Sequence, residues 1–462
     1  MMERDTRTGM VMADIRRRIA ARALTPGEKL PSIRRLAARL GVSPSTVVEA
    51  YDRLVADGAI RSRPGSGFYV CGTAAPLDLA EVGPKLDREI DPFWVSRQSL
   101  DAPPGMSMPG CGWLPADWMP ETAIRKALRQ LARSDGAILT EYGSTRGSAR
   151  LRRLIVRQLA GEGLPVEPEN LMLAGSGTQA IDLICRFLLR PGDIVLVDDP
   201  CYFNFHALLK AHQVRVEGIP YNPDGPDMDR LNAVLEASHP RLYITNSALH
   251  NPTGATISPR IAHQVLTAAA RHDLVIIEDD IFAGFEPDSS PRLAALDGLE
   301  RVIRIGSFSK TLSAAMRCGY IAARRDWVEA LVDLQVATAF GGPSPVSAEL
   351  LSEMLADGGY RKHMDALRLK LARYRRSMAD RLAGIGIRPW LMPRGGFYLW
   401  CMLPDGLDAA DVARRALEEK VVLAPGNVFS PTRSSTGFMR FNVSQMDAPS
   451  LFGVLDRSLR PG

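Results

Sequence analysis

The first sixty residues carry apolar side chains at helical spacing, separated by short polar turns. From Val11 to Ile19 apolar residues recur every four positions, which predicts a helix over 11–23. A second helix is predicted to begin after Ser32, a good N-cap residue, and to end at Gly41, which suits a left-handed backbone. The pattern therefore predicts two successive helices in the first forty residues.

A third helix is predicted directly after the second. Ser43 followed by Pro44 is a typical helix start, so the second and third helices would form a helix-turn-helix. The segment Pro64-Gly65-Ser66-Gly67 lies between the short runs 59–63 and 68–70 and predicts a β-hairpin, or wing, with basic residues at its base. Each piece alone could be an ordinary helix pair or turn, but their order predicts a winged helix.

Charge is unevenly distributed along the chain. The first 75 residues hold thirteen Lys and Arg against seven Asp and Glu, whereas the remainder is close to neutral and the whole chain carries +5. A basic end of this kind favours contact with a polyanion such as double-stranded DNA. The alternative is a winged helix that docks onto another protein.

The rest of the chain shows a different pattern. Residues 73–105 contain five prolines and few apolar runs, which predicts a linker between a domain at 1–72 and a larger one at 106–462. In the larger domain, amphipathic helices alternate with short apolar runs, which predicts an α/β fold with a mainly parallel sheet. The runs lie at 170–174, 194–197, 242–245, 274–278, 302–305 and 319–322.

Polar motifs follow several of these runs, where open α/β sheets bind ligands. Lys310 comes after the run 302–305, with Ser307 and Ser309 close by. A lysine desolvated at a strand end has a lowered amine pKa and can form a Schiff base with an aldehyde cofactor. The alternative for Lys310 is an ordinary surface charge.

Such a cofactor, pyridoxal phosphate, also needs a site for its phosphate. Ser176-Gly177-Thr178 opens a predicted helix, whose N-terminal N–H groups favour anions. Ser307, Ser309 and Arg317 are further candidate phosphate partners. Taken alone, the first motif could be no more than a helix start.

The pyridine ring would need partners of its own. Asp279, at the end of the run 274–278, is placed to keep a proton on the ring nitrogen, and Asn251 could bond the 3′ oxygen. Tyr202 could stack on the ring, with core packing as the alternative. Arg440 could bind a carboxylate, with a surface salt bridge as the alternative. The neighbouring Asp280 is expected to face a nearby loop.

Other functional classes are disfavoured. The six cysteines are widely spaced and suggest neither a disulfide framework nor a metal site. No apolar run is long enough to span a bilayer, and residues 1–10 lack the apolar core of a signal peptide. A soluble cytoplasmic protein without a metal or a membrane partner is therefore predicted.

The N-terminal motifs resemble the winged helix of GntR-type bacterial repressors. The resemblance rests on 30–37, 41–43, 46–47 and 65–70. It implies that DNA phosphates and base edges in the major groove are contacted by Arg34, Ser43, Ser45 and Thr46. It also implies that the wing tip approaches the minor groove through Gly65, Ser66 and Gly67.

The motifs of the larger domain occur in the order found in fold-type I aminotransferases, which they resemble. They are 142–147, 176–179, 199–202, 251–254, Asp279, 307–310, Arg317 and Arg440. The resemblance implies a large and a small subdomain, pyridoxal 5′-phosphate on Lys310, and a homodimer in which Tyr142 reaches the partner's cofactor. It departs from the family at Ile281 and Phe282, where a tyrosine is usual, which puts efficient transamination in question.

Together the two halves resemble MocR-type regulators over essentially the whole chain. This implies a DNA-binding transcriptional regulator that senses an amino acid or amine effector through an external aldimine. One alternative is an active aminotransferase, converting an amino acid to a 2-keto acid, that carries a DNA-binding domain. A second is a DNA-binding protein whose larger domain is only a dimerisation scaffold.

Overall fold

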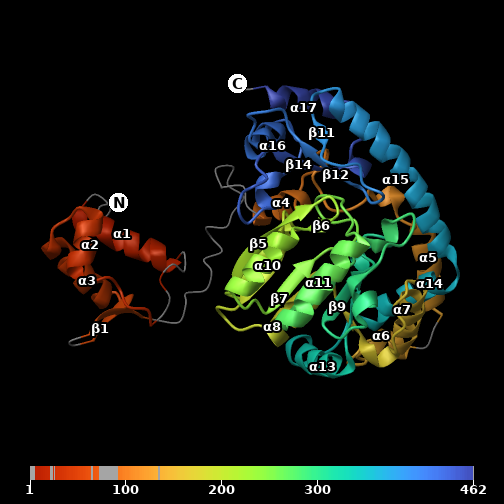
Figure 1. Cartoon of the computed structure of the whole chain (residues 1–462), viewed down its shortest axis with the longest axis horizontal. Coiled ribbons are helices and arrows are strands. Elements are labelled where there is room, and N and C mark those ends of the chain that lie inside the picture. The colour runs from red at the N-terminus through yellow and green to blue at the C-terminus, as the bar shows by residue number, and fades with distance from the viewer. Residues whose placement is uncertain are drawn as a thin grey trace. The chain divides into compact units, whose positions relative to one another are not determined.

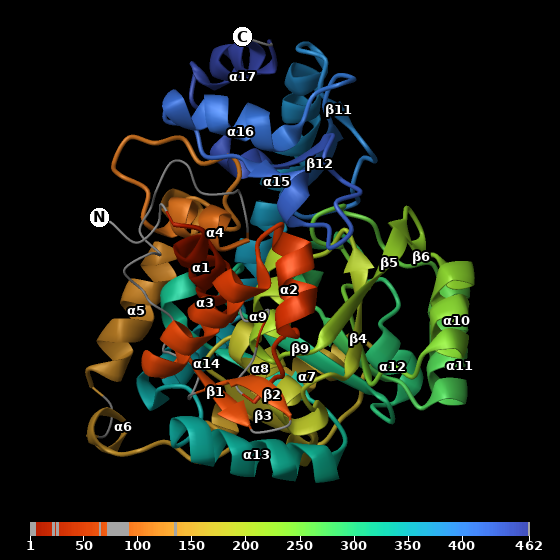
Figure 2. The same ribbon diagram turned by 90° about the vertical axis from the view of Figure 1, so that its left-hand side faces the viewer.

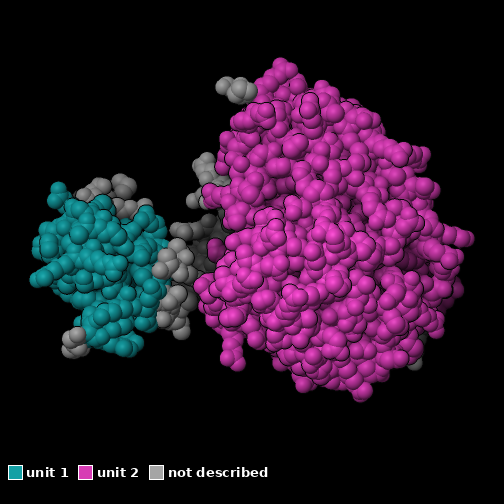
Figure 3. Space-filling model, in the orientation of Figure 1, with its two compact units in different colours: residues 1–88 teal, residues 89–462 magenta. Residues whose placement is uncertain are grey.

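The computed structural model describes residues 6–20, 24, 27–63, 66–71, 92–133 and 136–460 of the 462-residue chain. The chain divides into two compact units, Met1–Arg88 and Glu89–Gly462, which Figure 3 colours separately. Each unit has a hydrophobic core of its own.

The first unit consists of three helices followed by a β-hairpin. Its elements are α1 (Arg7–Ala20), α2 (Ile33–Leu40), α3 (Pro44–Ala56), β1 (Ile60–Arg63) and β2 (Gly67–Val70). The predicted helix-turn-helix and hairpin are confirmed. Helix α1 begins earlier than the apolar pattern predicted, because the Thr6 hydroxyl accepts a hydrogen bond from the Gly9 N–H and caps the helix.

Local sequence sets the ends of α2 and α3. The side chains of Ser32 and Ser43 accept hydrogen bonds from N–H groups in the first turns of α2 and α3. Gly41 ends α2 with a φ of 65°, a left-handed conformation that glycine adopts without strain. The core includes Tyr51, whose hydroxyl donates a 2.8 Å hydrogen bond to the Pro31 carbonyl.

The second unit is built around an eight-stranded sheet (Figure 1). Strands β4, β5, β7, β8 and β9 are parallel, whereas β10 is antiparallel to both of its neighbours and β6 to β5. The sheet confirms the predicted α/β fold, and the predicted runs account for all of its strands except β5 and β6. In spatial order the strands are β3 (Leu171–Ala174), β10 (Gly319–Ala322), β9 (Val302–Ser307), β8 (Val275–Asp279), β7 (Leu242–Thr245), β4 (Ile194–Asp199), β5 (Arg215–Asn222) and β6 (Gly225–Pro226).

Helices cover both faces of this sheet. Successive strand residues point to opposite faces, so Leu196 packs into one core while Val195 and Val197 pack into the other. One face carries α8 (Gly177–Leu188), α9 (Phe203–Ala211) and α13 (Arg325–Ala339). The other carries α5 (Glu121–Leu131), α7 (Ala149–Gly161), α10 (Met228–Ala237), α11 (Pro259–His272), α12 (Leu293–Asp297) and α14 (Pro345–Ala356); the short α6 (Ala137–Thr140) packs near α14.

A smaller antiparallel sheet completes the second unit. It contains β11 (Arg388–Pro389), β12 (Tyr398–Met402), β14 (Phe438–Asn442) and β13 (Ala424–Pro425), in that order. Its core is shared with α15 (Gly359–Ala383), α16 (Ala409–Glu418) and α17 (Leu451–Leu459). Figure 2 shows α16, α17 and β11 gathered at one end of this unit. These elements form a small subdomain beside the large sheet.

The range 73–105, predicted to be a linker, contains a helix. Helix α4 (Pro92–Leu100) lies in it, and Val95 is 1% exposed within the core of the small subdomain. The prolines suggested extended chain, but Pro92 occupies the first helical position, where its missing N–H breaks no hydrogen bond. Residues 72–91 lie outside the described part of the chain. In the described ranges no helix is both long and apolar enough to cross a membrane.

Candidate functional site

The carboxyl ends of neighbouring strands bring several of the candidate residues to one edge of the large sheet. Strand β8 ends at Asp279, which pairs with Ile305 of β9, and Lys310 follows the end of β9 by three residues. Asn251 and Ser176 follow β7 and β3 respectively. Because these strands run in the same direction, their ends meet at the edge where such folds bind ligands.

Lys310 is held in a desolvated position. Burial, together with the positive charges of Arg440 and Arg317, lowers the pKa of its amine to about 8. Cys111 and Asp279 act in the opposite direction. The predicted desolvation of Lys310 is therefore present, and a useful fraction of its amine is neutral near physiological pH.

Asp279 is buried at the end of β8. Burial raises the pKa of its carboxyl to about 7, although a 3.1 Å hydrogen bond from the Ile281 N–H partly opposes this rise. The Asn246 side chain donates a 2.7 Å hydrogen bond to the Asp279 carbonyl and fixes the strand end. A buried carboxyl with a raised pKa can share a proton with a basic nitrogen placed beside it.

Arg440 is 1% exposed on β14, so it forms no surface salt bridge. Its guanidinium donates a 2.9 Å hydrogen bond to Oδ1 of Asn251 and a 2.8 Å hydrogen bond to the Gly110 carbonyl. The Tyr398 ring lies 4.2 Å from the guanidinium carbon. The Arg440 Nε is buried and has no hydrogen-bond partner among the described residues, which leaves a donor for an anion.

A buried network supports the turn that carries Asn251. His250 contacts Asp198 at 3.1 Å through Nε2 and Thr253 at 2.8 Å through Nδ1. The Tyr221 ring stacks on His250 with 3.9 Å between ring centroids. These contacts tie the turn after β7 to the end of β4, and they hold Asn251 in place beside Arg440.

The start of α8 and the loop after β9 form a second cluster of candidate residues. Ser176 caps α8 by accepting from the Gln179 N–H, and Thr178 is exposed in the first turn. A Cβ atom added to Gly177 would lie 2.5 Å from Ile281 Cδ1, so the start of α8 packs closely against the Ile281 side chain, just after β8. The hydroxyls of Ser307 and Ser309 lie 3.0 Å apart.

Three further residues that were predicted to contact the cofactor differ from one another in their exposure and contacts. Arg317 is exposed and has a φ of 45°. Tyr202 is partly buried between Phe203 and Phe205, and its pKa is raised by burial and lowered by the charge of Arg440. Tyr142 is 85% exposed and contacts Phe340 at 5.1 Å between ring centroids, so within this chain it does not join the Lys310 cluster.

Asp280 proves to be part of an ion-pair network in the protein interior. It contacts Arg292 at 2.8 Å and Arg304 at 2.5 Å, and all three side chains are at most 2% exposed. Burial raises the pKa of Asp280 to about 6, and the two arginines oppose this rise. Asp280 was expected to face a neighbouring loop, and it does contact Arg292, the residue just before α12; its other partner, Arg304, lies on β9.

In the first unit the candidate DNA-binding residues lie on exposed surface. Ser43, Ser45 and Arg34 are exposed and Thr46 is half-buried. The Ser43 hydroxyl lies 2.8 Å from that of Ser45 and 2.7 Å from that of Thr46, so these three side chains form a compact polar cluster at the start of α3.

The wing is described only in part, because Gly65 lies outside the described residues. Ser66 contacts the Tyr69 hydroxyl at 2.6 Å, and Gly67 has a φ of 110° that favours glycine. The Arg63 guanidinium lies 4.7 Å from the centre of the Tyr69 ring. This stacking places a positive charge on the hairpin, and residue type alone did not single out Arg63.

Comparisons with known proteins agree with these two kinds of site. Residues 116–457 match the family "Aminotransferase class I and II". The chain belongs to the aminotransferase class I and II family. Residues 7–70 match "Bacterial regulatory proteins, gntR family". Both resemblances drawn from the sequence, a GntR-type helix-turn-helix and an aminotransferase-like domain, are therefore confirmed.

Full-length relatives combine the same parts. The chain is 27% identical over 416 residues to the uncharacterized HTH-type transcriptional regulator YisV of Bacillus subtilis, covering 87% of this chain and 85% of YisV. It is 28% identical over 447 residues to the uncharacterized HTH-type transcriptional regulator YdcR of Escherichia coli, covering 93% of each. These relatives extend over both units.

A solved aminotransferase shares the fold of the second unit. LysN, the α-aminoadipate aminotransferase of Thermus thermophilus, superimposes with a TM-score of 0.73 at 25% sequence identity. The match covers 82% of this chain and 96% of LysN, whose structure contains N-(5′-phosphopyridoxyl)-L-leucine.

The aminotransferase domain also contains site residues that sequence reasoning missed. A Cβ atom on Gly112 would lie 3.8 Å from Lys310 Nζ and 3.2 Å from the Tyr398 hydroxyl, so both residues border the lysine. A Cβ atom on Gly110 would lie 2.4 Å from the backbone of Leu423. The spacing of Gly110 and Gly112, two glycines separated by one residue, could have indicated from the sequence that other groups approach the backbone closely here. Nothing in the sequence around Tyr398 indicated that it would lie near Lys310.

Proposed function

We propose that this chain is a pyridoxal-phosphate-dependent transcriptional regulator that binds double-stranded DNA and senses an amino acid or amine. The proposal rests on one observation above all. A chain that begins with a GntR-type helix-turn-helix also places the partly buried Lys310 close to the buried Asp279 and Arg440. The names of the B. subtilis and E. coli relatives, and the phosphopyridoxyl group in LysN, support the same conclusion.

The residues around Lys310 fit pyridoxal 5′-phosphate. The donor set pairs a primary amine whose pKa is about 8 with a buried carboxyl whose pKa is about 7. When bound, the cofactor supplies an aldehyde that combines with amines and a ring that withdraws electrons. Lys310 would hold it covalently, and Asp279 would keep a proton on the ring nitrogen.

Other residues would position the ring and the phosphate. Asn251 uses Oδ1 to accept from Arg440, which leaves its N–H groups for the 3′ oxygen. Tyr202 would pack against the ring. The unpaired N–H groups at the start of α8 would receive the phosphate. Its further partners would be Ser176, Gly177, Thr178, Ser307, Ser309 and Arg317.

Arg440 would recognise the effector. Its Nε is buried without a partner, and its terminal nitrogens bond two neutral oxygens that a carboxylate can replace. A carboxylate at this position would bring the amine of an amino acid toward Lys310. In this arrangement Arg440 would bind the carboxylate of the effector, and the cofactor would react with its amine.

In a homodimer, the DNA-binding units of the two subunits would act together. Arg34 and the start of α3, with Ser43, Ser45 and Thr46, would contact the major groove, and the wing tip at 65–67 the minor groove. Two such units would bind two half-sites of one operator in the cytoplasm. The exposed Tyr142 would reach the partner's cofactor phosphate.

A second candidate function is transamination itself. The shared fold with LysN favours it. Against it, Ile281 and Phe282 place apolar side chains where many relatives offer a second hydroxyl to the 3′ oxygen: Ile281 contacts Gly177, and Phe282 packs on Phe397. Steady-state assays of amino acids with a 2-keto acid separate the two functions.

The proposed function is tested on DNA selected by the full-length protein from random duplexes. We expect the selected duplex to contain two half-sites, and its affinity to change when a particular amino acid or amine is added to cofactor-loaded protein. If no duplex is enriched, or if no amine from a complete amino-acid and polyamine panel changes the affinity, the proposal is wrong.

A further inference from the structure

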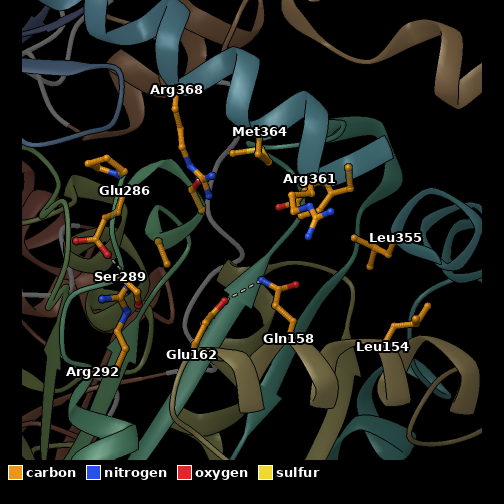
Figure 4. Close-up of a pocket in the computed structure, with 14 residues that line it drawn as sticks. Leu154, Gln158, Glu162, Glu286, Ser289, Arg292, Leu355, Arg361, Met364 and Arg368 are labelled. Carbon is orange, nitrogen blue, oxygen red and sulfur yellow. Dashed lines mark hydrogen bonds and ion pairs between the residues drawn. The ribbon is translucent and has the colours of Figure 1, made fainter. Parts of the chain in front are cut away.

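A cavity of about 350 Å³ lies in the second unit, apart from the Lys310 site. It is bordered by the end of α7, the segment 283–292, and the helices α14 and α15 (Figure 4). No residue assigned above to the cofactor or the effector lines it. Its volume is at the lower end of the range for small-molecule sites in proteins.

The acidic groups on its wall are already compensated. Glu286 bonds Arg292 at 2.7 Å, and both side chains are almost completely buried. Glu162 pairs with Arg304 and also accepts a 3.0 Å hydrogen bond from Gln158. This part of the wall therefore offers no free anion to attract a cation.

The opposite wall carries positive charge. Arg361, Met364 and Arg368 lie on one face of α15 at positions i, i+3 and i+7, and Figure 4 shows both arginines extending toward the side of Gln158 and Glu162. Arg368 donates to the Gly284 carbonyl at 3.0 Å and to Asp365 at 2.8 Å.

Arg361 differs from Arg368 in having no partner. Its side chain makes neither an ion pair nor a hydrogen bond with any residue that the structure describes, so its charge is not compensated locally. Apolar surface completes the cavity close to it, from Leu154 of α7, Leu355 of α14 and Met364. A positive charge beside apolar walls suits a ligand that has one anionic end and an apolar body.

We propose that this cavity binds a small organic monocarboxylate, with the carboxylate on Arg361 and the apolar part against Leu154, Leu355 and Met364. The site is independent of the proposed function, since it uses none of the cofactor or DNA residues. It adjoins the lysine loop: His363 Nε2, on the same helix, lies 3.0 Å from the carbonyl of Thr311, the residue after Lys310.

The test uses 4-fluorobenzoate as the probe and follows its ¹⁹F line width during titration with the full chain. We expect saturable binding that weakens about tenfold in Arg361→Gln, the size of one charge-assisted hydrogen bond, and less in Arg361→Lys. The matched control is Arg376→Gln, an exposed position on the same helix that does not line the cavity. Because Arg361 is exposed and unpartnered, its replacement should leave the melting temperature unchanged.

Further arms locate the site and define its ligand. Binding should persist in Lys310→Ala and Arg440→Gln, and 4-fluorobenzyl alcohol, which lacks the charge, should bind at least about tenfold more weakly. No binding to the wild-type chain, equal binding to Arg361→Gln, loss of binding in Arg440→Gln alone, or displacement by equimolar inorganic phosphate would each overturn the inference. None of these results bears on DNA binding or on the cofactor.

Discussion

Arg440 of the small subdomain donates a 2.9 Å hydrogen bond to Oδ1 of Asn251 in the large subdomain, 189 positions earlier in the chain. The same guanidinium bonds the Gly110 carbonyl. One side chain therefore links three segments that are distant in sequence. A ligand carboxylate that displaces either neutral oxygen would change how these segments are held together.

Replacing Arg440 with Gln should reduce the response to amino acids much more than the response to amines without a carboxylate. A lost charge-assisted hydrogen bond costs about 1.5–3 kcal/mol, or roughly 10- to 150-fold in affinity. The measurement is a titration of cofactor-loaded protein followed by its visible absorbance. The control is Arg414→Gln, an exposed residue paired with Asp411 on α16. Equal losses for both ligand classes would remove Arg440 from carboxylate recognition.

Attachment of pyridoxal phosphate should accelerate as pH rises through about 8. Burial lowers the pKa of Lys310 to about 8, and only the neutral amine attacks an aldehyde. The fraction of neutral amine grows about tenfold between pH 7 and pH 9 and then levels off. Stopped-flow absorbance measures this rate. A rate that keeps rising toward pH 10.5 would mean that Lys310 is not desolvated before the cofactor binds.

Asp279→Asn should leave cofactor attachment intact and slow the exchange of the effector's α-proton. The substitution removes the carboxylate expected to keep the ring nitrogen protonated, while Lys310 is unchanged. We expect the exchange rate in D₂O, measured by NMR, to fall by at least about 100-fold. The exposed Asp224→Asn serves as the control. Unchanged exchange would show that Asp279 does not face the ring nitrogen.

Lys310→Ala should separate DNA binding from sensing. The variant keeps the first unit unaltered, so its affinity for the selected duplex without effector should equal that of the wild type. The effector-dependent change, typically about 5- to 150-fold, should vanish. Fluorescence anisotropy with labelled duplex measures both quantities. A wild-type response in this variant would favour a sensing route that bypasses the lysine.

Arg34→Ala should weaken binding to all DNA sequences by a similar factor. A side chain that contacts phosphate contributes to affinity without reading bases, and its removal should lower the salt slope by about one. The control is Arg17→Ala, because Arg17 pairs with Asp14 at 2.5 Å on α1. If Arg34→Ala instead changed the preferred sequence at one base pair, Arg34 would read a base edge.

Short motifs predicted much of the fold and of the site. The caps Ser32 and Ser43, and the residues Lys310 and Asp279 at strand ends, act over a few positions, so local sequence determines them. The helix over 92–100 escaped prediction because proline at a first helical position looks like a loop signal.

Contacts between distant segments could not be predicted in the same way. Nothing near Arg440 in the sequence indicates that it would reach Asn251, and nothing near Tyr398 indicates that it would border Lys310. The same is true of Asp280 and Arg304. Each is a charged residue of a type usually found on the surface, and only the tertiary fold buries the two side chains against each other. Pairings of this kind depend on tertiary packing, which residue type and spacing do not encode locally.

Helix α15 is a stiff rod of 25 residues, about 37 Å long. Near its beginning His363 touches the Thr311 carbonyl, and further along Arg375 donates to the Gly396 and Arg394 carbonyls next to the small sheet. A rod fastened at both places transmits displacement along its length. A rigid-body movement of the small subdomain would therefore bend α15 or displace the backbone next to Lys310. The position of the small subdomain and the position of Lys310 are coupled through this helix.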